Sequence, residues 1–393
     1  MLHAPEKPIA DPVVARRFAR WLSLVYGAVF GLGGISLPFF PVWLKAVGID
    51  VGWIGVITAL PSLTRFTVLP FATALAERRG MLRQAIVGFA FLTSLGFIAV
   101  GLGGSLIPIL LLYGLTACVW TPIVPLVDGY ALKGVAQFGL DYGPLRLWGS
   151  AAFVAGALAC GLLIDVVAPR HVIWIMVAMA LFGAGASLGL VPLAARGTAK
   201  DAPAQQAHLL RQPGFLAIIV SAALIQGSHA AYYSFGSIAW QSAGLSGLTV
   251  SLLWSLGVIA EIIVFAVSPR FTWSPAVLVA MGAASAMLRW SVTALAPPLS
   301  LLALVQMLHA FTYGLTQVGT VGLMLRHVPA HLMATAQGYL AATSGIVLGL
   351  AYIGSGLLFA RFGDGAYFAM AVMGAAGGAL ILFGQPHSKA SGG

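Results

Sequence analysis

Long apolar segments separated by short polar breaks run through the whole chain, and no other feature constrains the fold as strongly. They lie at about residues 18–44, 52–76, 84–103, 107–128, 145–166 and 171–193, and again at about 214–240, 249–267, 275–295, 299–325, 333–357 and 366–384. A helix needs about 20 apolar residues to cross the hydrocarbon core of a bilayer. The pattern therefore predicts an all-α integral membrane protein with twelve transmembrane helices.

The composition excludes several classes of protein. Of the 393 residues, 60% are hydrophobic and 8% are charged, whereas ordinary soluble domains carry about 25% charged residues. We therefore exclude a water-soluble enzyme, a disordered protein and a nucleic-acid-binding protein, although the net charge is +10. The two cysteines, Cys118 and Cys160, lie inside apolar segments, where we expect small buried side chains and neither a disulfide nor a metal site.

The longest internal polar stretch divides the chain into two nearly equal parts. We predict an N-terminal six-helix bundle at 1–193, a cytoplasmic linker at 194–213 and a C-terminal six-helix bundle at 214–393. Two helical halves of this kind are typical of secondary transporters. With both termini cytoplasmic, fourteen Lys and Arg residues fall on the cytoplasmic side and only three, Lys45, Arg170 and Arg361, outside. This bias favours cytoplasmic N and C termini.

Few ionisable side chains interrupt the apolar segments. The informative ones are Arg65, Asp128, Arg146, Glu261 and Arg289, together with His229 and His309, whereas Asp165 lies at the outer end of its segment, where headgroups and water reach it. A charged group inside a bilayer costs a few kcal/mol or more unless it is paired or faces a watery cavity. These residues are therefore the candidates for a transport site.

Two interpretations are open for Asp128 and Arg146, which lie near the facing ends of the fourth and fifth segments. Both residues lie at the membrane interface, with Arg146 extending toward the headgroups, or both face a central cavity. In the second case Phe153, seven residues after Arg146, shares its helix face. Arg65, in the second segment, is either a cavity residue or a gate between the bundles.

Glu261 lies in the middle of the eighth segment, and we expect Arg289 in the ninth to be its counter-charge. Because burial penalises charge, a lone carboxylate here favours its protonated form, which suits a proton carrier. His229 and Tyr233 share one face of the seventh segment, and His309 lies on a polar face of the tenth. For both histidines a packing role and a functional role are equally open.

The residue types also indicate a substrate class. Arginine binds carboxylates in a bidentate manner, and aromatic side chains stack on planar rings. A small aromatic monocarboxylate satisfies both. We recognise no metal-ligand constellation, catalytic nucleophile or phosphate-binding loop in the sequence, so we predict a protein that is not an enzyme and uses no metal or cofactor. The energy for transport would then come from an ion gradient.

Four stretches carry a resemblance to known proteins. They are Pro38–Lys45, Val124–Asp128 followed by Leu140–Ser150, Gln226–Tyr233 and Leu253–Glu261. They are similar to the lactose-permease branch of the major facilitator superfamily, and most similar to phenylpropionic acid transporters. The resemblance implies a monomeric, multi-pass protein of a bacterial inner membrane whose partners are the lipid bilayer, a small-molecule substrate and a proton. It implies proton symport that imports a phenylpropionate-like acid by alternating access. Symport of a sugar or nucleoside, and efflux of a drug or metabolite, are the alternatives.

The resemblance also implies roles for individual residues. It implies substrate binding by Asp128, Arg146, Phe153, Arg289 and His309, and we add His229 and Tyr233 because they share the polar face of the seventh segment. The expected proton-coupling residues are Glu261, His309 and Asp128. Gln306 and Thr312 replace a lysine and a glutamate of the lactose permease, so the coupling site must differ. A degraded form of the family's cytoplasmic signature, at Thr73–Gly80, contains Glu77 and Arg78, for which a gating role is expected alongside Arg65.

Overall fold

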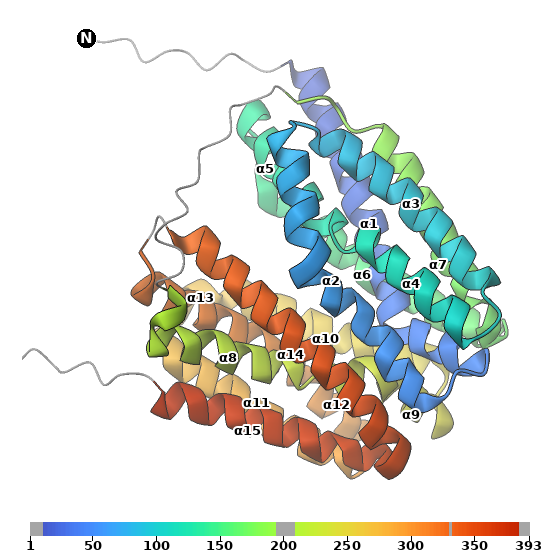
Figure 1. Cartoon of the computed structure of the whole chain (residues 1–393), viewed down its shortest axis with the longest axis vertical. Coiled ribbons are helices and arrows are strands. Elements are labelled where there is room, and N and C mark those ends of the chain that lie inside the picture. The colour runs from blue at the N-terminus through green and yellow to red at the C-terminus, as the bar shows by residue number, and fades with distance from the viewer. Residues whose placement is uncertain (1–10, 194–208, 330–331, 385–393) are drawn as a thin grey trace, which may run out of the picture.

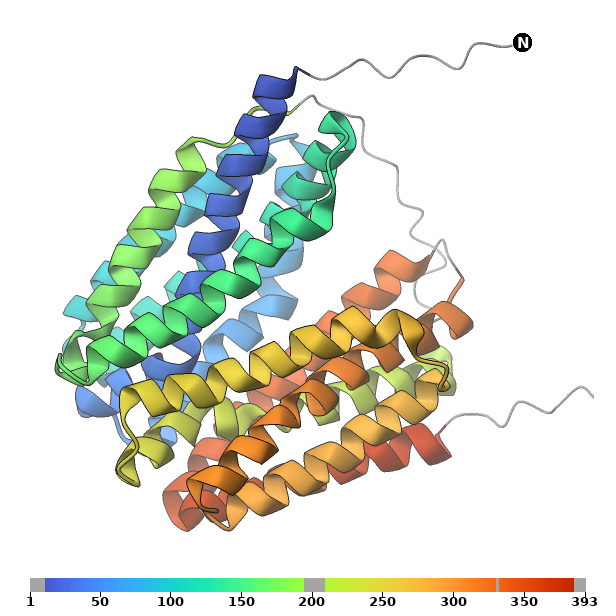
Figure 2. The ribbon, with the colours of Figure 1, turned by 180° about the vertical axis from the view of Figure 1, so that it is seen from behind.

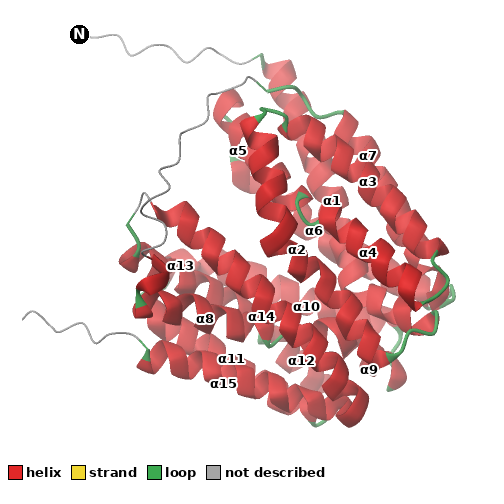
Figure 3. Ribbon diagram, viewed as in Figure 1, coloured by secondary structure: helices red, strands yellow, loops and turns green. Residues whose placement is uncertain are grey.

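The structure is a computed structural model that describes residues 11–193, 209–329 and 332–384. Residues 194–208, which make up most of the predicted linker, and both chain ends lie outside the described residues. Every regular element in the described ranges is a helix or a helical turn (Figure 3). The predicted all-helical fold is therefore confirmed.

The first group of helices comes from the part of the chain before residue 194. It consists of α1 (Pro12–Ala46), α2 (Val51–Arg78), α3 (Leu82–Leu102), α4 (Leu106–Trp120), α5 (Ile123–Phe138), α6 (Tyr142–Ile164), η1 (Pro169–His171) and α7 (Val172–Leu188). α4 and α5 form one apolar stretch, Leu106–Phe138, with a short break at Thr121 and Pro122.

The second group comes from the part of the chain after residue 208. It consists of α8 (Pro213–Gly227), η3 (Tyr232–Gly236), α9 (Ser237–Ser242), α10 (Gly247–Val267), η4 (Ser268–Arg270), α11 (Pro275–Ala294), α12 (Leu299–Met307), η5 (Ala310–Leu315), α13 (Thr316–His327), α14 (Met333–Phe362), η7 (Gly363–Gly365) and α15 (Ala366–Phe383). The elements η3 and η5 are π-helical.

Eleven stretches among the described residues are long and apolar enough to cross a membrane. The last one, Thr335–Phe383, is 49 residues long and contains both α14 and α15, joined by the turn η7. Large apolar side chains are exposed on the outside of the protein, for example Leu111 (61%), Leu115 (68%) and Phe383 (83%). A lipid environment accounts for such exposure, because water would penalise it.

The two groups of helices touch at one end and diverge toward the other (Figures 1 and 2). We call the end where α7 finishes and α8 begins the linker end, and the opposite end the far end. At the far end Lys45 Nζ donates to Ser242 Oγ (3.0 Å), and the hydroxyls of Thr58 and Ser234 are 2.8 Å apart. These two contacts join α1 to α9 and α2 to η3, so polar side chains connect the groups there.

Glycines allow the backbones of the two groups to approach each other closely at the far end. A Cβ atom on Gly55 of α2 would lie 2.5 Å from the backbone oxygen of Tyr352 on α14. A Cβ atom on Gly247 of α10 would lie 2.5 Å from the backbone oxygen of Gly161 on α6. Atoms at that distance overlap, so the contact as it stands requires residues without side chains.

Candidate transport site

Two helices of the second group are interrupted where they carry histidines. The stretch Pro213–Ser242 contains the π-helical turn η3, and the stretch Leu299–His327 contains η5. His229 lies in the break before η3, and His309 immediately precedes η5. Their rings meet edge-on, with centroids 5.3 Å apart and an angle of 79° between the ring planes. π-helical turns are rare and occur frequently at functional sites, so these breaks mark the place to examine.

Arg289 of α11 lies at the centre of this region and is fully buried. Its terminal nitrogens donate to Gln306 Oε1 (2.7 Å), His309 Nδ1 (3.0 Å) and Thr312 Oγ1 (3.3 Å). The guanidinium also lies over the rings of Tyr232 (4.8 Å) and Trp290 (4.4 Å). Arg289 is therefore held by protein groups on several sides.

The hydrogen bond from Arg289 fixes the protonation pattern of His309. A guanidinium has donors only, so His309 Nδ1 must accept and carries no proton. The proton of the neutral ring is then on Nε2, which lies 3.3 Å from Glu261 Oε2. His309 thus joins Arg289 to Glu261, and the expected direct pair between those two residues is not formed. The prediction of a direct counter-charge was wrong because His309 lies between them.

The same reasoning assigns the hydrogen bonds of His229. A backbone oxygen accepts only, so His229 Nδ1, 3.0 Å from the oxygen of Gln226, carries the proton. His229 Nε2 then accepts from the hydroxyl of Thr312 at 2.9 Å. Thr312 accepts in turn from Arg289. When the His229 ring is neutral, Arg289, Thr312 and His229 form a directed chain of hydrogen bonds.

Glu261 of α10 is the most accessible member of this network. Its side chain is 19% exposed, against 10% for His309, whereas Arg289 and His229 are fully buried. The 3.3 Å contact of Glu261 with His309 is the one approach within 4 Å of a carboxylate to a Lys, Arg or His side chain among the described residues. The carboxylate is therefore the group of the network that solvent or a ligand reaches first.

An aromatic wall surrounds the network. Tyr233 stacks on His229 (5.6 Å between centroids) and on Trp254 (5.9 Å), and Tyr313 stacks on His309 (5.6 Å). Sequence reasoning does not identify Tyr313 or its neighbour Tyr352. Tyr352 lies on α14 with its ring 6.5 Å from that of Tyr233. No motif indicates Tyr352, because only folding brings α14 to η3.

A second polar cluster lies in the first group of helices. Asp128 of α5 accepts hydrogen bonds from the hydroxyls of Tyr26 (2.6 Å) and Tyr142 (3.0 Å). The Arg146 guanidinium lies over Phe30 at 3.9 Å and beside Tyr26 at 5.5 Å. Asp128 and Arg146 form no ion pair in the described ranges, and the ring of Tyr26 contacts both. Tyr142 was missed as a partner although it lies within the motif that contains Arg146.

The other predicted site residues occupy different places. The ring of Phe153 packs against Gly33 of α1, and a Cβ atom on Gly33 would lie 3.7 Å from that ring. Glu77 and Arg78 are both exposed at the end of α2, and the Glu77 carboxylate lies close to Gly129 of α5. Arg65 is an exposed residue of α2. The structure thus places the predicted residues in two clusters, one in each group, with Arg65 and the pair Glu77–Arg78 apart from both.

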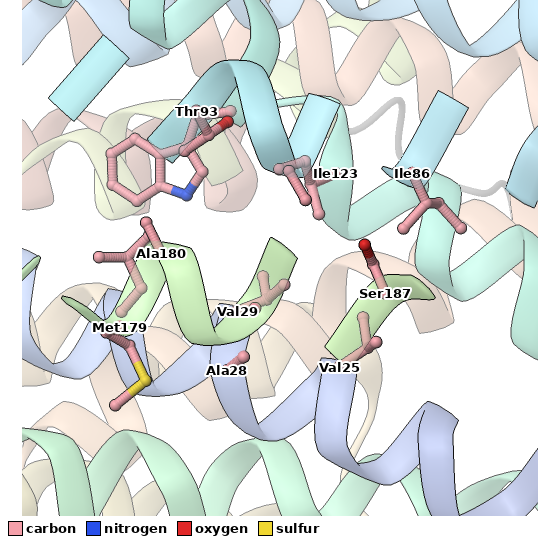
Figure 4. A pocket seen from close by; sticks show the side chains of 13 residues that line it. Val25, Ala28, Val29, Ile86, Thr93, Ile123, Met179, Ala180 and Ser187 are labelled. Carbon is pink, nitrogen blue, oxygen red and sulfur yellow. The ribbon is translucent and has the colours of Figure 1, made fainter. Parts of the chain in front are cut away.

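A pocket between helices of the first group is not part of either cluster. Val25, Ala28, Ile123, Met179 and Ala180 are among the mainly apolar side chains that line it (Figure 4). No charged side chain lines this pocket. The pocket contains no charged group that could pair with a charged substrate, so we interpret it as a gap in helix packing.

The helical fold and the two intramembrane polar clusters define a polytopic protein of the transporter class. The family model described as "MFS_1 like family" matches residues 19–370, so the chain belongs to this family of major facilitator transporters.

Relatives support the assignment. The chain is 31% identical over 367 residues to the "Probable 3-phenylpropionic acid transporter" of Escherichia coli (strain K12), a match that covers 90% of this chain and 94% of that protein. It is 28% identical to the "Maltose permease" of Geobacillus stearothermophilus, covering 88% and 89%. Among solved structures, the nucleoside transporter NupG is similar with a TM-score of 0.81 at 15% identity, covering 93% of this chain and 97% of that one, which shows a shared fold.

Proposed function

We propose that this protein is a proton-coupled symporter that imports a small aromatic carboxylate by alternating access. It would cross a bacterial inner membrane twelve times, as two six-helix bundles at 1–193 and 214–393 with both termini cytoplasmic. The twelfth crossing follows if α14 and α15 each span the bilayer. Their 30 and 18 residues correspond to about 45 Å and 27 Å of helix, and a bilayer core is about 30 Å thick.

The position of Glu261 is the observation that carries the proposal of proton coupling. His309 gives its Nδ1 lone pair to Arg289, so a second proton on His309 would place two cations against each other. His229 is fully buried, and its Nδ1 proton is donated to the backbone oxygen of Gln226. Glu261, partly exposed and attached to the network by one contact, is therefore the group that gains and loses the proton.

The substrate class is supported by two observations. The relative with 31% identity is named as a probable transporter of 3-phenylpropionic acid. The two clusters also combine cations with aromatic faces: Arg146 lies on Phe30, and Tyr233 stacks beside Trp254. A carboxylate bound through an arginine and an aryl ring stacked on a neighbouring side chain would use both kinds of group.

Alternating access would use the contact at the far end. In the proposed orientation that end is external, so the described structure is closed to the outside and opens toward the cytoplasm. Import would require the contacts between Lys45 and Ser242, and between Thr58 and Ser234, to break as the bundles rock.

The proposal is tested by uptake of radiolabelled 3-phenylpropionate into cells that express the protein, with and without a protonophore. We expect uptake that collapses with the protonophore and in Glu261→Gln. Asp50→Asn is the matched control, because Asp50 is an acidic residue at the far end whose side chain makes no cap hydrogen bond. Uptake that changes neither with the protonophore nor in Glu261→Gln would indicate a facilitator and would refute proton coupling.

Two further assays address the other substrate classes. Absence of 3-phenylpropionate uptake, with the protein present in the membrane, would refute the substrate. Maltose uptake would then indicate the sugar alternative, because a maltose permease is 28% identical to this chain. Accumulation of a drug in inverted membrane vesicles would indicate efflux.

A further inference from the structure

Arg65 is a charged residue half-way along a membrane-spanning helix. It is the fifteenth residue of α2, which runs from Val51 to Arg78. At a rise of 1.5 Å per residue, the Cα atom of Arg65 lies about 20 Å from either end of the helix. An arginine side chain is too short to reach the headgroups from there, so interfacial exposure does not explain the charge.

The surroundings of Arg65 show that it faces the second group of helices. A Cβ atom on Gly345 of α14 would lie 3.4 Å from the Cβ atom of Arg65. The guanidinium is also close enough to act electrostatically on the phenols of Tyr313 and Tyr352, both in the second group. Arg65 therefore belongs to the interface between the groups and not to the lipid surface.

Tyr313 connects this arginine to the proton-coupling network. Its ring stacks on His309, whose Nε2 contacts Glu261. The charges of Arg65 and Glu261 both act on the Tyr313 phenol. A Cβ atom on Gly314, the residue after Tyr313, would lie 3.8 Å from Glu261 Cγ. Tyr313 is therefore within electrostatic reach of a cation of the first group and of the carboxylate of the second.

Arg65 also differs from the other two intramembrane arginines in having no partner. It is exposed and makes no hydrogen bond or ion pair anywhere in the described ranges. Arg289 is fully buried behind Gln306, His309 and Thr312, and Arg146 lies against Phe30. An exposed cation at mid-membrane depth that has no ion pair within the protein is free to pair with a bound anion.

We infer that Arg65 binds the carboxylate of the transported acid, with Tyr313 and Tyr352 beside it, and that Arg289 holds His309 in place instead of contacting the substrate. This inference rests on the proposed function. It also gives the sign of coupling. An anion at Arg65 lies near Glu261 and opposes a second negative charge there, so substrate binding favours the protonated carboxyl group. By linkage, protonation of Glu261 then favours substrate binding equally.

The test compares binding of 3-phenylpropionate and of its neutral amide, 3-phenylpropionamide, to the purified protein in detergent. A hydrogen bond to a charged group contributes about 1.5–3 kcal/mol, so Arg65→Gln should weaken binding of the acid about 10- to 100-fold. Binding of the amide should change less than threefold, which also shows that the variant is folded. Arg65→Lys should recover part of the acid affinity, because it restores the charge without the bidentate geometry.

Arg79→Gln is the matched control, since Arg79 is an exposed arginine at the C-cap of the same helix. Equal losses for acid and amide in Arg65→Gln, or no loss for the acid, would overturn the role of Arg65 and leave the proposed transport activity standing. Failure of the wild-type protein to bind the acid at all would overturn both proposals together.

Discussion

Asp165 connects the two groups of helices through the first turn of α10. Its Oδ1 accepts from the backbone N–H of Gly247 (2.6 Å), and its Oδ2 accepts from that of Leu248 (3.1 Å). Ser246, the N-cap residue of α10, accepts from Thr249 N through its own side chain. The free amides of this turn are thus satisfied partly by α10 itself and partly by a carboxylate from the other group.

The asparagine variant, Asp165→Asn, should therefore weaken closure of the far end. The substitution removes the negative charge next to the N-terminus of α10, and it leaves the side chain with one acceptor oxygen instead of two. Loss of a helix cap costs about 0.5–2 kcal/mol, and the exposure of Asp165 favours the lower part of this range. A change within this range shifts the ratio of closed to open molecules about 2- to 30-fold toward the open form.

The assay is the distance distribution between spin labels at Ala168 and Ala243, which are exposed residues on the two sides of the contact. Cys118 and Cys160 are replaced first so that only the introduced thiols react. Asp165→Asn should increase the population with long distances. Asp50→Asn is the control and should leave the distribution unchanged, because its side chain caps nothing. A closed population in Asp165→Asn equal to that of the parent protein would refute the capping account.

Two other changes test the packing and the polar network. Gly55→Ala should also open the far end, because the added methyl group would lie 2.5 Å from the oxygen of Tyr352, whereas Gly52→Ala has free space and should not; the same spin labels report both. Arg289→Gln should destabilise the folded protein by about 2–4 kcal/mol, because it leaves buried acceptors unpaired, and should lower the thermal unfolding midpoint more than Arg146→Gln does. Equal midpoints for the two arginine variants would contradict the structural role assigned to Arg289.

The fold was predictable because it depends on the length and hydropathy of whole segments and not on individual contacts. Apolar stretches of about 20 residues are visible without knowledge of any contact, since each helix satisfies its own backbone hydrogen bonds in the bilayer. The break in the tenth segment was not predicted. The π-helical turn that begins at Ala310 leaves no sign in the hydropathy of the segment.

The sequence predicted which residues belong to the candidate site better than it predicted which of them contact each other. Rare charged residues identified Glu261, Arg289 and Asp128, because each is conspicuous in an apolar segment. The prediction that Glu261 pairs directly with Arg289 was wrong, because pairing depends on which rotamers and helix faces meet. The partners of Asp128 were missed for the same reason: Tyr26 is 102 residues away along the chain.

The most direct test of the account is proton movement during substrate entry. Purified protein in liposomes is given inward-directed 3-phenylpropionate without a pH gradient, and the external pH is followed. The wild-type protein should make the medium more alkaline as the acid enters. Glu261→Gln should show no such change while it still exchanges labelled for unlabelled acid across the membrane. An alkaline shift of normal size in Glu261→Gln would contradict the assignment of Glu261 as the proton carrier.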